Sequence, residues 1–237
     1  MTLITYLAAH FPAQRLKHKL IELHAYSSDA SFYQLVPRAI VFPVTVEEIQ
    51  LLFAIAKKYH TSLTFRTAGT SLSGQSVTDG ILVDLSRHWN KASVELNGEL
   101  VRVQPGITGR DINHLLKKYG KKIGPDPASI NAAMMGGILS NNSSGMCCGV
   151  ADNSYHTLQY VHFILPDGKE FNTALAGDYK RFEEEEREIF DGIHALRNSV
   201  WNNAMLLANI RRKYQMKNTV GYSINAFVDY EHQLDIL

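Results

Sequence analysis

A run of glycine, serine and threonine at residues 66–76 is the part of this sequence best suited to binding an anion. It reads Arg-Thr-Ala-Gly-Thr-Ser-Leu-Ser-Gly-Gln-Ser and lies between two strand-like segments, 63–65 and 81–85. Glycine has no Cβ, so the backbone of such a loop can approach a ligand closely. Consecutive N–H groups in a turn form a concavity that holds anions, and hydroxyl groups add donors. A phosphate or pyrophosphate is the expected ligand.

The residues around this run exclude two common phosphate-binding motifs. The nicotinamide type needs G-x-G-x-x-G opening into a helix, and a P-loop needs G-x-x-x-x-G-K-[ST]. Neither motif occurs in the chain. The run leads through residues 77–80 into a strand, so no helix N-terminus is expected to face the anion. On spacing alone, an ordinary polar turn is an equally good interpretation.

Two further segments make a ligand site the better interpretation. Residues 123–145 combine paired glycines with small polar residues, and residues 37–49 read as a strand, a proline and a helix start. Taken in their order along the chain, 37–49, 66–76 and 123–145, the three segments resemble the FAD-binding domain of a known family. That family includes vanillyl-alcohol oxidase, p-cresol methylhydroxylase and the D-2-hydroxyacid dehydrogenases. The resemblance runs from about Pro37 to Gly168. It implies an α+β fold with two lobes around an extended cofactor.

The resemblance also implies which residues bind FAD. The first run would donate amides to the pyrophosphate, Pro43 would lie against the adenine, and residues 129–145 would contact the flavin. Arg66 would pair with a phosphate or, equally well, form a surface ion pair. Thr70 stands where some members carry a histidine that attaches the flavin covalently, which implies non-covalent FAD. The implied contacts are Pro43, Arg66, Thr67, Ala68, Gly69, Thr70, Ser71, Ser73, Gly74, Ser129, Gly136, Gly137, Asn141, Ser144 and Gly145.

Residues 146–153 and 213–222 resemble one branch of this family more specifically. In that branch a substrate-side domain and an iron–sulfur domain follow, and D-2-hydroxy acids such as lactate, glycolate or 2-hydroxyglutarate are oxidised by hydride transfer to flavin N5. The family's FAD domain continues past Leu237, so this chain is expected to be an N-terminal piece without an assignable catalytic base. The alternatives are a non-catalytic binding or assembly module, and a flavin reductase such as the enolpyruvyl-sugar reductase of cell-wall synthesis.

Composition sets broader limits. The chain has 237 residues and a formal net charge of +1, so no basic field argues for nucleic acid. No run approaches the ~20 apolar residues of a membrane helix, and the N-terminus lacks the pattern of a secretion signal. The two cysteines, Cys147 and Cys148, are adjacent and too few for a zinc or iron–sulfur site, and the histidines show no metal-ligand spacing. We expect no metal and a cytoplasmic location.

Hydrophobic patterning predicts strand–helix–strand architecture in two lobes, residues 1–105 with the first run and residues 106–237 with the second. A Thr-x-x-Glu capping box at Thr45 predicts a helix from Val46 to Tyr59, and Asn97-Gly98 predicts a hairpin turn. The other expected elements are helices at 12–24, 106–119 and 181–211, and strands at 39–42, 62–66, 81–85, 94–96, 100–103, 157–165 and 169–171.

Overall fold

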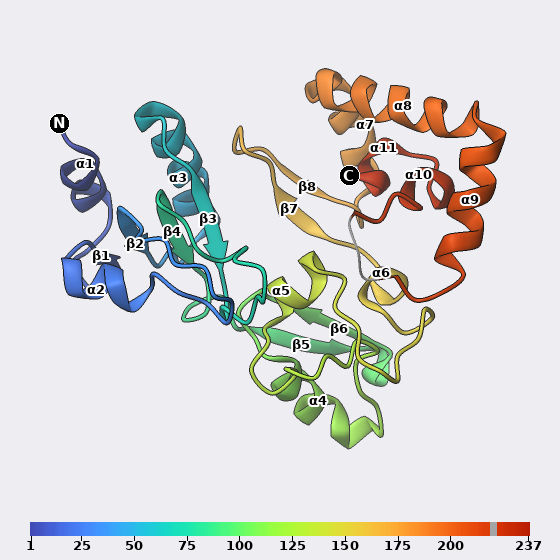
Figure 1. Ribbon diagram of the computed structural model, residues 1–237, viewed down its shortest axis with the longest axis horizontal. Coiled ribbons are helices and arrows are strands. Elements are labelled where there is room, and N and C mark those ends of the chain that lie inside the picture. The colour runs from blue at the N-terminus through green and yellow to red at the C-terminus, as the bar shows by residue number, and fades with distance from the viewer. Residues whose placement is uncertain (219–221) are drawn as a thin grey trace.

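A computed structural model of the protein describes residues 1–218 and 222–237. Thr219, Val220 and Gly221, part of the segment 213–222 that carried the family-branch resemblance, lie outside the described residues. Figure 1 shows the chain running from an N-terminal sheet with its helices, through a hairpin and helix α4, to a group of C-terminal helices. Within the described residues, no helix is both long and apolar enough to cross a lipid bilayer.

A mixed sheet of four strands forms the N-terminal unit, in the order β1-β2-β4-β3. Strand β2 (Ala39–Val41), β3 (Leu63–Arg66) and β4 (Ile81–Asp84) are parallel, and β1 (Leu16–Lys17) pairs antiparallel with β2. Strands β2 and β4 are buried along their whole length, as expected for the centre of a sheet with parallel strands. Helix α1 (Leu3–His10) and helix α3 (Val46–Tyr59) pack in the same hydrophobic core.

Helix α3 has the predicted bounds, Val46 to Tyr59. The Glu48 carboxylate, however, accepts from the Val44 amide, one residue before the Thr45 amide that a capping box would use. The Thr45 side chain accepts a hydrogen bond from the Glu48 amide, and His60 ends the helix in the left-handed conformation. The helix expected at 12–24 is wrong: the chain instead forms strand β1, and helix α2 (Leu20–Ala25) begins only after it. Leu16 pairs with Val41 and is buried, whereas Leu20 is 68% exposed. Pairing with β2 therefore outweighs a helical spacing of leucines that does not match their burial.

A second unit is built on the antiparallel hairpin of β5 (Ala92–Glu95) and β6 (Leu100–Val103). The predicted Asn97-Gly98 turn is present within the 3₁₀ turn Leu96–Gly98, with Leu96, Asn97 and Gly98 all at positive φ. Helix α4 (Gly109–Leu116) continues into a 3₁₀ turn, Lys117–Tyr119. Gly120 follows in the left-handed conformation, so the helical segment ends where the sequence predicted. The apolar side chains of the hairpin pack in one cluster with Ile107, Ile112 and Ile138. This packing groups the hairpin with the residues that follow it, and the division at residue 105 stays a prediction.

The C-terminal helices pack around a third apolar cluster, which contains Leu165, Phe171, Phe182 and Leu234. The strand expected at 157–165 is shorter, because residues 154–157 form a helical turn. The long helix expected at 181–211 is divided at Glu186 and again at residues 202–203. The elements of this unit are α6 (Ser154–Thr157), β7 (His162–Ile164), β8 (Glu170–Asn172), α7 (Ala176–Glu185), α8 (Arg187–Trp201), α9 (Ala204–Tyr214), α10 (Ala226–Asp229) and α11 (Gln233–Ile236).

Candidate functional site

The first ribbon, residues 66–76, begins where the parallel strand β3 ends. Ligands of open sheets with parallel strands bind beyond the carboxyl ends of those strands, so this is a favourable position for a site. Gly69 and Gly74 have φ of +66° and +75°, in the left-handed region that favours glycine. A Cβ at Gly69 would lie 2.7 Å from Nε of Arg66, and a Cβ at Gly74 would lie 2.8 Å from the Tyr33 ring. Backbone conformation therefore favours glycine at both positions, and a side chain there would also have to displace the Arg66 guanidinium or the Tyr33 ring.

Residues 26–31 hold the two ends of the first ribbon. The Arg66 guanidinium donates to the carbonyl oxygens of Tyr26 and Ser28, at 3.1 and 2.9 Å. At the other end, the Asp29 carboxylate accepts from the Ser76 hydroxyl at 2.9 Å and from the Ser31 hydroxyl at 2.5 Å. Burial acts to raise the pKa of the Asp29 carboxyl, but hydrogen bonds from these two serines outweigh it and keep the pKa below its ordinary value. Asp29 thus stays ionised and fixes the ribbon.

The middle of the first ribbon presents free hydrogen-bond donors. Among the described residues, none accepts a hydrogen bond from the backbone amides of Thr67 to Leu72. The Ser71 hydroxyl accepts from the amides of Ser73 and Gln75, at 3.2 and 3.3 Å, which closes the ribbon into a turn. Consecutive unpaired amides in a turn are the arrangement that binds anionic oxygens.

The second ribbon, residues 129–145, is held to the chain that follows the hairpin. Met134 forms a β-bridge with Thr108, and the Gly136 amide donates to the Pro105 carbonyl at 2.9 Å. These bonds place the short helix α5 (Met135–Ser140) with its two glycines facing the first ribbon. A Cβ at Gly136 would lie 3.3 Å from the Thr67 methyl group, and one at Gly137 would lie 3.6 Å from the Thr67 hydroxyl. The two ribbons therefore meet at Thr67.

A cavity of about 640 Å³ lies between the two ribbons. Small-molecule sites are typically ~300–1,000 Å³, so the volume suits an extended cofactor. Among the described residues that line the cavity, Arg66 is the one with a charged side chain. No carboxylate among them would therefore repel a bound anion. The proposed FAD contacts that line the cavity are Arg66, Thr67, Gly69, Thr70, Ser71, Ser73, Ser129, Gly136, Gly137, Asn141 and Ser144.

Four proposed contacts do not line this cavity. Pro43 is buried and does not line the cavity, and its carbonyl accepts from the Trp89 indole at 2.8 Å. Ala68 and Gly74 belong to the first ribbon but are not among the residues that line the cavity. Gly145 is buried, and a Cβ there would overlap the carbonyl of Asp126, so its lack of a side chain serves packing. Whether these four residues touch a cofactor stays a prediction.

Sequence reasoning missed several lining residues. Leu72, Gln75 and Ser76 lie within the first run, and Ser140, Asn142 and Ser143 lie within the second, so closeness to the motif could have identified them. Pro105 was predicted only as a boundary between lobes, yet it lines the cavity. No local signal marks Pro105, because its role follows from the bond that Gly136 donates to it.

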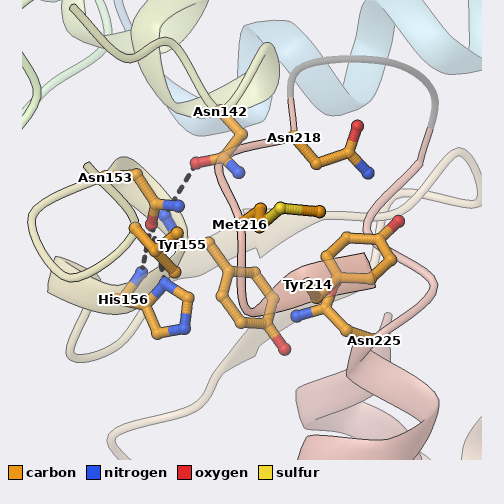
Figure 2. A pocket seen from close by; sticks show the side chains of 9 residues that line it. Asn142, Asn153, Tyr155, His156, Tyr214, Met216, Asn218 and Asn225 are labelled. Atoms are coloured by element: carbon orange, nitrogen blue, oxygen red, sulfur yellow. Dashed lines mark hydrogen bonds between the residues drawn. The ribbon is translucent and has the colours of Figure 1, made fainter. Parts of the chain in front are cut away.

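Asn142 also lines a second, much smaller pocket of about 10 Å³ (Figure 2). Asn142 has a φ of +43°, and its side-chain oxygen accepts from the Tyr155 amide at 2.9 Å. The Tyr155 hydroxyl donates to Asp229 at 2.9 Å, and burial together with this bond raises its pKa well above the ordinary value. Tyr214 and Met216, from the end of α9 and the residues after it, line the same pocket. The C-terminal part of the chain therefore packs against the end of the second ribbon.

Comparison with known proteins agrees with this geometry. The chain is 35% identical over 158 residues to D-2-hydroxyglutarate dehydrogenase of Pseudomonas putida strain KT2440, covering 64% of this chain and 16% of that protein. Glycolate oxidase subunit GlcD of Escherichia coli K12 is 27% identical over 166 residues, covering 69% of this chain and 33% of the relative. The chain thus spans only a sixth to a third of the length of these two relatives.

Solved structures share the fold. An alkyldihydroxyacetonephosphate synthase matches with a TM-score of 0.61 and 24% identity, covering 76% of this chain and 37% of that one. The 6-hydroxy-D-nicotine oxidase of Arthrobacter nicotinovorans matches with a TM-score of 0.58 and 15% identity, covering 66% and 35%. The predicted α+β fold of the p-cresol methylhydroxylase type is confirmed. A family model described as an FAD binding domain matches residues 37–174, more than half of the chain, and this protein therefore belongs to that FAD-binding family.

Proposed function

We propose that this chain is the FAD-binding portion of a flavin-dependent oxidoreductase that oxidises a D-2-hydroxy acid. The observation that carries the proposal is the cavity of about 640 Å³ enclosed by both ribbons, with Thr67 in contact distance of the two glycines. The substrate class is supported by the relatives of the chain, which include a D-2-hydroxyglutarate dehydrogenase and a glycolate oxidase subunit.

The residues present fit FAD at its pyrophosphate. The unpaired amides of Thr67 to Leu72 would donate to the phosphate oxygens, and the Thr70 hydroxyl would add a donor. Hydrogen bonds to charged groups contribute roughly 1.5–3 kcal/mol each, so several of them would account for tight binding. Thr70 carries no group that forms a covalent link to the flavin, and we propose that FAD is bound non-covalently.

The second ribbon fits the flavin end. Gly136 and Gly137 would let the backbone approach the ring closely, and Asn141 and Ser144 would offer polar atoms at its edge. When bound, FAD supplies a two-electron acceptor for the hydride of the substrate. The chain's own share is to bind and orient that group and to exclude water from one side of it. We assign no catalytic base within this chain, and we propose an iron–sulfur domain as the electron acceptor of the complete enzyme.

Titration of the purified chain with FAD, followed by flavin fluorescence and thermal unfolding, tests the proposal. We expect saturable binding, a higher unfolding temperature, competition by ADP, and weaker binding of riboflavin, which lacks the pyrophosphate. Lack of saturable FAD binding would refute the proposal and favour the alternative of a module that keeps the fold without the cofactor. Bleaching of the flavin by D- but not L-2-hydroxy acids, in the polypeptide encoded by the complete reading frame, tests the substrate class.

A further inference from the structure

Residues 214–218 begin with the last residue of helix α9 and lie against the end of the second ribbon. Tyr214, Met216 and Asn218 line the small pocket that Asn142 shares (Figure 2). Between them, the Lys217 side chain reaches the ribbon itself. Its ammonium donates to the carbonyl oxygen of Gly145 at 2.5 Å and lies 3.5 Å from that of Ser144. Lys217 thus contacts the second ribbon, whereas Tyr214, Met216 and Asn218 line the small pocket next to it.

The contacts of Gly145 show that this end of the ribbon is confined from two directions. On one side the Asp126 backbone leaves no room for a Cβ at Gly145. On the other, Lys217 donates to its carbonyl oxygen. Ser144 lines the cavity, whereas Lys217 does not. Any effect of Lys217 on a ligand in the cavity must therefore pass through the ribbon or through the electrostatic field.

The charge of Lys217 is not paired with a carboxylate. Among the described residues, no Asp or Glu oxygen lies within 4.0 Å of its ammonium, although ion pairs are frequent elsewhere on the surface. Arg66, a charged residue that lines the cavity, belongs to the first ribbon and donates to the backbone carbonyls of Tyr26 and Ser28. Lys217 therefore places a positive charge beside the end of the second ribbon. A charge close to a bound flavin tunes its electronics. Lys217 is exposed, so solvent screens this interaction more than it would screen that of a buried charge.

We propose that Lys217 is a positioning residue for the flavin end of the cavity. It holds the second ribbon through the carbonyl oxygens of Ser144 and Gly145, and its charge favours the reduced flavin, which is the more negative form. The inference rests on the proposed function and adds to it a residue outside both glycine-rich runs. Lys217→Met removes donors and charge, Lys217→Gln keeps donors without the charge, and Lys217→Arg keeps both.

The positioning role is tested first in the chain without cofactor, by amide NMR. The amides of Gly145 and Met146 each follow a carbonyl that Lys217 contacts, so their resonances should move in Lys217→Met and return close to their original positions in Lys217→Arg. Lys213→Met is the matched control. Lys213 is an exposed lysine in the last turn of α9, and its substitution causes the same change in charge. Unmoved resonances, or equal shifts in the control, would overturn the positioning role.

The electrostatic role is tested by the midpoint potential of the FAD-loaded chain. We expect Lys217→Met and Lys217→Gln to reduce the preference for reduced over oxidised FAD about tenfold, which is ~30 mV for a two-electron couple. Lys217→Arg and Lys213→Met should keep the wild-type potential. Equal potentials in all variants would overturn this role. If the wild-type chain binds no FAD, the proposed function fails, and the NMR comparison alone decides the positioning role.

Discussion

Substitution of Gly137 by alanine separates the cofactor site from the stability of the fold. Gly137 lies inside helix α5, where alanine is more favourable than glycine by about 0.5–1 kcal/mol. A Cβ there would lie 3.6 Å from the Thr67 hydroxyl, an ordinary van der Waals contact. In the FAD-free protein, Gly137→Ala should therefore leave the free energy of unfolding unchanged or raise it slightly.

The added methyl group would, however, occupy space at the wall of the cavity. If the flavin lies against this backbone, the methyl overpacks the complex at a cost of roughly 1–3 kcal/mol. That cost weakens FAD binding about 5- to 150-fold, since ~1.4 kcal/mol corresponds to a factor of ten. Calorimetric or fluorescence titration gives the dissociation constant, and chemical unfolding of the FAD-free protein gives the stability.

Gly192→Ala is the matched control for Gly137→Ala. Gly192 lies inside helix α8, and a Cβ there would have no neighbour within 4 Å. The control should gain the same helical preference without any loss of FAD affinity. Wild-type FAD affinity in Gly137→Ala would refute the assignment of the second ribbon to the flavin. A large loss of stability in the FAD-free variant would refute the reasoning from the Thr67 contact.

Three further outcomes are expected. Gly136→Ala should lower the free energy of unfolding by about 1–2 kcal/mol in chemical denaturation, because its Cβ would lie 2.7 Å from the Pro105 ring; stability equal to wild type would contradict the packing. Acid precipitation of the FAD complex should leave all flavin in the supernatant, and a yellow pellet would show a covalent link. Glu48 binds Arg15 at 2.6 and 2.8 Å; burial acts to raise its pKa, but these bonds outweigh it and the pKa is lowered from 4.5. The bonds between Glu48 and Arg15 should contribute roughly 1–2 kcal/mol to the free energy of unfolding. This contribution should be complete above pH 4.5 and fade as the pH falls through the lowered pKa of Glu48. Glu48→Gln should remove that pH dependence from unfolding curves.

Local chemistry in the sequence was enough to predict several elements and a loop suited to a phosphate or pyrophosphate. Helix α3 begins at Val46 because Thr45 satisfies the Glu48 amide, and the Asn97-Gly98 turn forms because both residues adopt positive φ. Such features depend on neighbours within a few residues. The glycine-rich runs are of the same kind, since only small residues leave a backbone open to a ligand. Their resemblance, in their order along the chain, to a known flavoprotein family predicted an FAD-binding domain, which the family match confirms.

The tertiary structure decided how these pieces meet. Leu16 lies in a strand because Val41 pairs with it, which no spacing of leucines around residue 16 reveals. The cavity exists because Gly136 bonds to Pro105 and so comes within contact distance of Thr67, a residue far away in sequence. Lys217 reaches Gly145 only because the C-terminal helices fold back over the second ribbon. Contacts between distant segments depend on the packing of the whole chain, and a pattern of neighbouring residues carries no record of them.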